Sequence, residues 1–178
     1  LLLFVPAILF EGFSLGNSPD CSKGRKSGKR QRDNEKDYIF VGIEKRRDGM
    51  VRKGKAEDCR GIYELICDME EKELPWDTFS QMYGEMLADS RHVFLVWEEE
   101  KQVKGVLHLL IERQLHHAAI VAEIMEFAVD KDARSNGIGG EMLTYASTLA
   151  KEAGCVQIEV ACNQLRKNTH RFYLREGM

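Results

Sequence analysis

The stretch Glu123–Gly140, EIMEFAVDKDARSNGIGG, sets out a strand, a loop and the start of a helix. Ile124–Val129 is apolar, a polar turn follows it, and glycines stand at positions 137, 139 and 140 before a segment of helix-forming residues. Glycines at the mouth of a helix let a ligand approach the backbone closely, and the free N–H groups there attract an anion. The stretch therefore predicts a binding site for a phosphate-bearing cofactor.

The spacing of the glycines narrows the choice of cofactor. The loop reads R-x-x-G-x-G over Arg134–Gly139, which differs from the G-x-G-x-x-G of dinucleotide folds and lacks the Lys of a kinase-type phosphate loop. It resembles the pyrophosphate loop of the GNAT superfamily of N-acetyltransferases, which bind acetyl-CoA. A tight strand-to-helix turn without any ligand is the alternative.

Composition and charge limit the class of protein. The chain has 178 residues with 43% hydrophobic and 31% charged residues, which indicates one soluble globular domain. Its five cysteines contain no C-x-x-C pair, a pattern typical of reduced thiols in the cytoplasm. Residues 50–178 hold 16 Lys/Arg against 22 Asp/Glu, so we expect no nucleic-acid partner.

The first 49 residues differ from the rest of the chain. Residues 1–10 are apolar but too short to span a membrane, and residues 23–32 form a basic cluster. We expect residues 1–49 to be a disordered or non-native leader, with translation starting at Met50, and residues 50–178 to be the domain.

Hydrophobic periodicity predicts elements in the order β-α-α-β-β-β-α-β-α. Asp77 is expected to cap the second helix, and Gly154 to end the helix that follows the glycine loop. The predicted strands are 51–54, 92–97, 103–111, 124–129 and 155–162, and the predicted helices are 57–71, 77–87, 141–153 and 168–174.

The end of the chain strengthens the resemblance to the GNAT superfamily. Asn163, followed by Thr169–Gly177 (THRFYLREG), resembles that family's closing N…FYxxxG segment. The resemblance implies an α/β fold with a mixed sheet and the cofactor at a splay between two parallel strands. It implies that Tyr173 protonates the leaving thiolate. The residues implied to bind the cofactor are Phe127, Ala128, Val129, Arg134, Asn136, Gly137, Ile138, Gly139, Gly140 and Asn163.

Within that superfamily the pattern is similar to the aminoalkylphosphonate N-acetyltransferases. The similarity is carried by His108-Leu109, Leu115–His117, Glu123–Glu126 and His170–Gly177. It implies acetyl transfer from acetyl-CoA to a small primary amine that bears a phosphonate. Two alternatives stay open, namely an acetyltransferase for polyamines or aminoglycosides, and a non-catalytic acyl-CoA-binding module.

Two carboxylates in the central strand are candidate bases. Glu123 and Glu126 are costly in an apolar strand unless they are used or paired. Being three residues apart, they would lie on opposite faces of a flat strand unless a bulge intervenes. We predict Glu123 as the catalytic base and Glu126 in a salt bridge or at the substrate.

Three histidines could relay protons, contact the phosphonate or bind a divalent metal. They are His108, in a strand, and His116 and His117, in a loop over 112–118. Adjacent histidines point apart in an extended chain, and the spacing matches no established metal signature, so the metal stays unknown.

The C-terminal end of the chain carries a further expectation. Members of the resembled family continue into at least one more strand, so we expect residues 50–178 to be a C-terminally truncated domain whose last parallel strand has an open edge. Homodimers are common in this fold, although no apolar stripe in the sequence indicates one.

Overall fold

The computed structural model describes residues 3–4, 7–9, 49–163 and 165–178. The strands are β1 (Leu3–Phe4), β2 (Ala7–Leu9), β3 (Gly49–Lys53), β4 (His92–Glu99), β5 (Gln102–Gln114), β6 (Ala119–Val129), β7 (Gln157–Val160) and β8 (Cys162–Asn163). The helices are α1 (Cys59–Glu70), α2 (Trp76–Ala88), α3 (Ile138–Glu152) and α4 (Lys167–Arg175), with short 3-10 helices η1 (Ala56–Asp58) and η2 (Lys131–Ala133). Apart from the added β1, β2 and β8, this is the predicted order.

A mixed sheet forms the centre of the domain, in the strand order β2-β7-β6-β5-β4-β3. Neighbouring strands are antiparallel except β6 and β7, which run parallel. The α/β fold class with a mixed sheet is therefore confirmed, and the one parallel pair connects through α3, as a parallel crossover requires.

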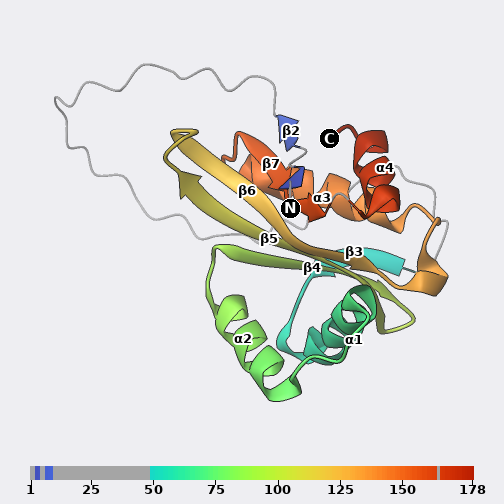
Figure 1. Ribbon diagram of the computed structural model, residues 1–178. Coiled ribbons are helices and arrows are strands. Elements are labelled where there is room, and N and C mark those ends of the chain that lie inside the picture. Colours follow the sequence, from blue (N-terminus) through green and yellow to red (C-terminus); the bar gives the residue numbers. More distant parts are fainter. Residues whose placement is uncertain (1–2, 5–6, 10–48, 164) are drawn as a thin grey trace.

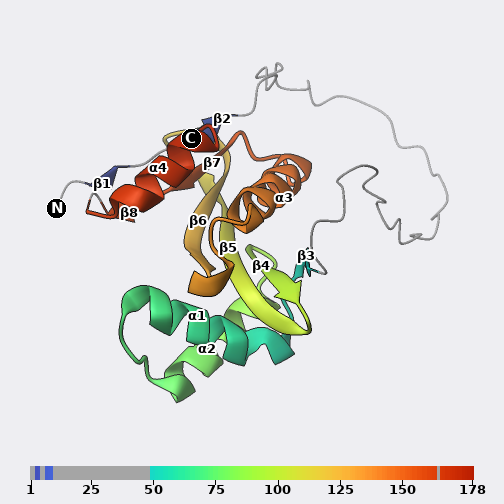
Figure 2. The ribbon, with the colours of Figure 1, turned by 90° about the vertical axis from the view of Figure 1, so that its right-hand side faces the viewer.

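Helices cover both faces of this sheet (Figure 1). Helices α1 and α2 pack on one face, where Ile62 and Tyr83 join Val96 and Val106 in one core cluster. Helices α3 and α4 lie on the other face, as the rotated view in Figure 2 makes clear. The larger core cluster lies there, and its fully buried members include Leu95, Leu107, Leu109, Met142, Ala146 and Ile158. Because β4, β5 and β6 are buried on both faces, their sequences read as apolar runs.

Helix boundaries follow local chemistry, with one correction. Helix α1 ends where Glu71 adopts a left-handed φ of 53°, and α3 is followed by Gly154 at φ 79°, as expected for a helix stop. The prediction that Asp77 caps the second helix is wrong. Pro75 occupies the cap position and Asp77 lies in the first turn, where its charge still suits the helix dipole.

The outer edge of β7 is covered, which corrects the expected open edge. β2 pairs with β7 in antiparallel register from Ala7↔Glu159 to Leu9↔Gln157, and β1 pairs with β8. These five residues of the expected leader therefore belong to the fold, because their extended backbone satisfies an otherwise unpaired strand edge. The remainder of that expectation concerns residues 10–48, which lie outside the described part of the chain.

Several strand limits differ from those predicted. β5 continues to Gln114, so the predicted loop shortens to a turn at 115–118, and the predicted strand 155–162 divides into β7 and β8.

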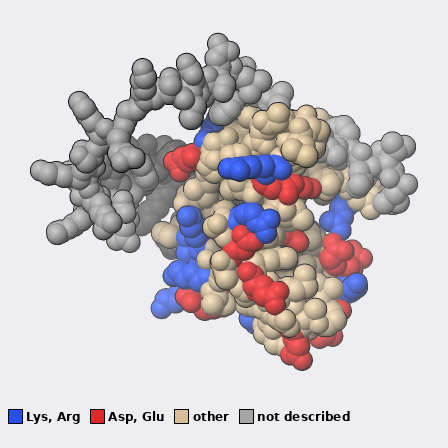
Figure 3. All heavy atoms as spheres, turned by 90° about the vertical axis from the view of Figure 1, so that its left-hand side faces the viewer, with Lys and Arg blue, Asp and Glu red and all other residues tan. Residues whose placement is uncertain are grey.

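The described cysteines, Cys59, Cys67, Cys155 and Cys162, are free. On the face drawn in Figure 3, acidic and basic side chains are interspersed. In the part of the chain that the structure describes, no helix has the length and apolarity needed to cross a membrane.

Candidate active site

β6 and β7 separate halfway along β6. Their parallel pairing covers only Ala122↔Ile158, Glu123↔Glu159 and Ile124↔Val160. Beyond this point β6 continues to Val129 with β5 as its partner on one side. The backbone groups of Phe127–Val129 that face β7 thus lack a strand partner. Apart from the Val129 carbonyl, which accepts from Arg134, an extended ligand arm could take their hydrogen bonds.

The loop after β6 is held by its own side chains. Asp130 accepts a hydrogen bond from the Asp132 amide, which shapes η2. The Arg134 Nε donates to the Val129 carbonyl at 2.9 Å, and the Asn136 amide donates to the Ala133 carbonyl at 3.1 Å. These bonds bring the loop back over the end of β6, so Arg134 and Asn136 position the glycines that follow.

The first turn of α3 forms a cradle with open N–H groups. Gly137 adopts φ 86°, and the Glu141 amide is the first to bond back to the Gly137 carbonyl, at 3.1 Å. The amides of residues 138–140 therefore have no acceptor within the helix. A Cβ on Gly139 would lie 3.0 Å from the Phe172 ring, so α4 packs closely on this turn. The helix dipole and these amides together suit a pyrophosphate.

Tyr173 lies on α4 beside this cradle. Its ring centroid is 6.5 Å from that of Phe127, and the residue is 3% exposed. Burial, together with the nearby Cys162 thiol, raises its pKa, so the phenol stays protonated at neutral pH. Among the described residues none hydrogen-bonds to its hydroxyl, which leaves the proton available to a ligand.

Asn163 has a structural task in the turn before α4. Its side-chain oxygen accepts from the Leu165 amide at 2.9 Å, and its carbonyl accepts from the Arg166 amide at 3.0 Å. Its predicted contact with the cofactor stays a prediction.

A β-bulge brings the two candidate carboxylates to one face. Glu126 pairs with His108, whereas Ile124 pairs with Leu109, so Met125 is an extra residue in β6. His108 and Leu110 are two apart and share a face, and the residues opposite them, Glu126 and Glu123, share it too. A bulge therefore intervenes, and the two carboxylates share one face instead of the opposite faces of a flat strand.

Glu123 has the environment of a base. Burial raises its pKa, and the carboxylates of Glu112 and Glu159 raise it further. Glu159 is in turn held by His117 Nε2 at 3.1 Å and by the Gln157 amide. A carboxyl group with a raised pKa accepts a proton more readily near neutral pH.

The histidines divide into two groups. His108 is buried and bonds through Nδ1 to Glu126 and through Nε2 to His92 at 2.8 Å. Glu126 thus has a hydrogen-bond partner, and its predicted salt bridge or substrate contact stays a prediction. His116 and His117 were expected to point apart, but their ring centroids are 4.2 Å apart because they lie in a turn. His92 was not predicted. Only its polar character at the start of an apolar strand could have indicated it.

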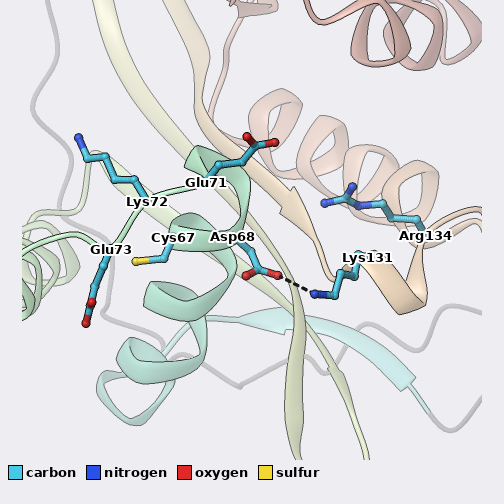
Figure 4. Close-up of a pocket in the computed structure, with 7 residues that line it drawn as sticks. All are labelled: Cys67, Asp68, Glu71, Lys72, Glu73, Lys131 and Arg134. Carbon is cyan, nitrogen blue, oxygen red and sulfur yellow. Dashed lines mark ion pairs between the residues drawn. The ribbon is translucent and has the colours of Figure 1, made fainter.

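A hollow of about 530 Å³ opens between the end of α1 and the glycine loop (Figure 4). Lys131 points across it toward Asp68, with 3.8 Å between Nζ and Oδ2, and Arg134 lies beside Lys131. The hollow is lined by Cys67, Asp68, Glu71, Lys72, Glu73, Lys131 and Arg134. Across the described ranges, no group of three or more His, Cys, Asp or Glu side chains is arranged to hold a metal ion.

Comparisons with known proteins agree with this geometry. Residues 59–178 match the model of the Acetyltransferase (GNAT) family. The aminoalkylphosphonate N-acetyltransferase of Salmonella typhimurium is 33% identical over 127 residues, which are 71% of this chain and 82% of that protein.

Solved structures show the same fold. A structure described as a transcriptional regulator from Bacillus halodurans superposes with a TM-score of 0.68 at 22% identity, over 73% of this chain and 92% of its own. Glucosamine-6-phosphate N-acetyltransferase from Arabidopsis thaliana gives a TM-score of 0.62 at 23% identity, over 73% of this chain and 90% of its own.

Proposed function

The chain belongs to the acetyltransferase (GNAT) family, an enzyme family that uses acetyl-CoA, and we propose that it acetylates the primary amine of a small aminoalkylphosphonate. The observation that carries this proposal is the splay of β6 and β7 beside the open first turn of α3, together with 33% identity to an aminoalkylphosphonate N-acetyltransferase.

The residues fit acetyl-CoA as the acetyl donor. The amides of residues 138–140 hold its pyrophosphate, and the unpaired edge of Phe127–Val129 holds the pantetheine arm by strand-like hydrogen bonds. When bound, acetyl-CoA supplies a thioester carbonyl, which a backbone N–H of this edge polarises. Arg134 keeps the loop closed on Val129.

Two side chains move protons during the transfer. Glu123 removes a proton from the acceptor ammonium, directly or through water, because its raised pKa suits a base. The neutral amine then attacks the thioester carbon, and the C–S bond breaks. Tyr173, which its raised pKa keeps protonated, donates its phenolic proton to the departing thiolate. The phenol then recovers the second proton that the attacking nitrogen loses as it becomes an amide.

The acceptor needs a carboxylate for its ammonium and a cation for its phosphonate. Glu126 and Glu123 share one face of the sheet, and we assign the ammonium to this face. We assign the phosphonate to Lys131, at the hollow beside the glycine loop. The four free cysteines that the structure describes accord with a reducing cytoplasm.

A second candidate acceptor is a polyamine or an aminoglycoside. The observation in its favour is the set of carboxylates on or beside the acceptor face, Glu112, Glu123, Glu126 and Glu159, which would attract a polycation.

A thiol-release assay separates these candidates. The full chain is given acetyl-CoA with 2-aminoethylphosphonate, propylamine or spermidine, each with and without a chelator. We expect the highest kcat/KM for 2-aminoethylphosphonate, and suppression by the chelator would assign a metal. A preference for spermidine would overturn the phosphonate assignment.

The Lys131→Gln variant tests the phosphonate contact. We expect it to raise KM for 2-aminoethylphosphonate while KM for propylamine and Kd for acetyl-CoA are unchanged. Lys101→Gln, an exposed lysine in the β4–β5 turn, is the matched control. A weaker Kd for acetyl-CoA would instead assign Lys131 to the cofactor.

A further inference from the structure

Three polar side chains form a continuous hydrogen-bonded chain across β4, β5 and β6. His92 Nδ1 lies 2.8 Å from His108 Nε2, and His108 Nδ1 bonds to a carboxylate oxygen of Glu126. The His108 ring also stacks on Phe94, with centroids 4.1 Å apart and planes 13° apart, and on His92, with centroids 5.0 Å apart.

Burial makes the hydrogen bonds of His108 obligatory. The residue is 2% exposed, so an imidazole nitrogen without a partner there would be costly. Both nitrogens are satisfied, one by each neighbour. The two outer residues of this hydrogen-bonded series are more accessible: the Glu126 side chain is 35% exposed, and His92 is partly buried.

An ionised Glu126 and a neutral His108 together fix the direction of both hydrogen bonds. An ionised Glu126 only accepts, so His108 must carry its proton on Nδ1. In a neutral His108 the Nε2 is then the acceptor, so His92 donates to it from Nδ1. Burial lowers the pKa of His92, as do His108 and Arg91, against the opposite effect of Asp89 and Glu126, so His92 is neutral at neutral pH.

We propose that His92 is a positioning residue for the acceptor amine, acting through His108 to hold Glu126 as the group that binds the ammonium. This inference rests on the proposed function. His108 engages one oxygen of Glu126, and the other has no hydrogen-bond partner among the described residues, on the face that also carries Glu123. The bulge at Met125 places this carboxylate where β6 leaves β7, beside the backbone assigned to the acetyl donor.

Two substitutions at position 92 separate positioning from packing. His92→Phe keeps a flat ring against His108 but removes the donor. His92→Asn retains an amide N–H close to the position of Nδ1. Since a hydrogen bond between neutral groups contributes about 0.5–1.5 kcal/mol, we expect His92→Phe to weaken acceptor binding by up to about tenfold and His92→Asn to restore most of it.

The deciding measurement compares the Kd values of two ligands for the full chain with CoA bound. 2-Aminoethylphosphonate carries the ammonium, and 2-hydroxyethylphosphonate carries a neutral hydroxyl in its place. His92→Phe should weaken the Kd of the first and leave the Kd of the second and the Kd of acetyl-CoA unchanged, while the Tm falls because the buried His108 Nε2 loses its partner. Glu85→Gln, an exposed carboxylate of α2, is the control for unrelated charge changes.

Each other outcome is decisive. Equal weakening of both ligands by His92→Phe would mean that His92 only supports packing, and unchanged binding of the amine would also overturn the inference. In either case, turnover of 2-aminoethylphosphonate by the wild-type chain would leave the proposed function intact. A wild-type chain that turns over no amine would overturn both.

Discussion

Replacement of Tyr173 by Phe separates chemistry from stability. The change removes one hydroxyl oxygen from a residue that is 3% exposed and whose hydroxyl has no hydrogen-bond partner among the described residues. No bond in this part of the fold is lost, so the free energy of unfolding should change by less than about 0.5 kcal/mol. Loss of the proton donor should lower kcat by about 10²–10⁴-fold, a barrier increase of about 3–5 kcal/mol.

A second tyrosine predicts the opposite result. The Tyr83 hydroxyl donates to the Lys55 carbonyl at 2.8 Å, in the core under α1 and α2. Tyr83→Phe leaves that carbonyl without its donor and should cost about 1 kcal/mol of stability, with kcat unchanged. Tyr145→Phe, on an exposed position of α3, should change neither quantity.

For these three variants, urea unfolding measures stability, thiol release measures kcat, and calorimetry measures the Kd for acetyl-CoA. The reasoning predicts that Tyr173→Phe loses turnover and retains acetyl-CoA. A Tyr173→Phe variant with wild-type kcat would refute the role of the phenol, and a variant that no longer binds acetyl-CoA would make Tyr173 part of the binding surface instead.

Two further predictions concern the base and the glycine loop. Burial and the carboxylates of Glu112 and Glu159 raise the pKa of Glu123, so ionisation of Glu123 disfavours the folded state. The protein is therefore relatively more stable at low pH, and this stabilisation is lost as the pH rises through the raised pKa. Glu123→Gln should therefore be more stable than wild type near pH 7 but not near pH 4 in urea unfolding, and equal differences at both pH values would contradict this. Gly137→Ala and Gly154→Ala each place a Cβ in open space at a positive φ, 86° and 79°, so both should lose about 1 kcal/mol of stability, while calorimetry should find weaker acetyl-CoA binding only for Gly137→Ala.

Much of this fold could be predicted from local sequence. The apolar run before the glycine loop, the helix after it and the stop at Gly154 each depend on a few neighbouring residues, and the structure has them where expected. The prediction for Asp77 failed because Pro75, whose ring fixes its φ, is also compatible with a helix start. Pro75 takes the cap position, and the helix begins at Trp76.

Features that depend on strand register could not be predicted. The bulge at Met125 decides that Glu123 and Glu126 share a face, yet no residue type marks it, because a register shift is set by pairing with β5. The contact of His92 with His108 arises from the β4–β5 hairpin in the same way. The pairing of Ala7–Leu9 with β7 joins segments far apart in sequence, for which single-sequence periodicity carries no signal.

Detection of the acetylated product tests the central claim most directly. The full chain is incubated with ¹³C-acetyl-CoA and 2-aminoethylphosphonate, and the products are analysed by mass spectrometry. Labelled N-acetyl-2-aminoethylphosphonate and free CoA in equal amounts, with loss of both in Tyr173→Phe, is the predicted result. Free CoA with labelled acetate and no acetylated amine would contradict the claim that this site transfers an acetyl group to such an acceptor.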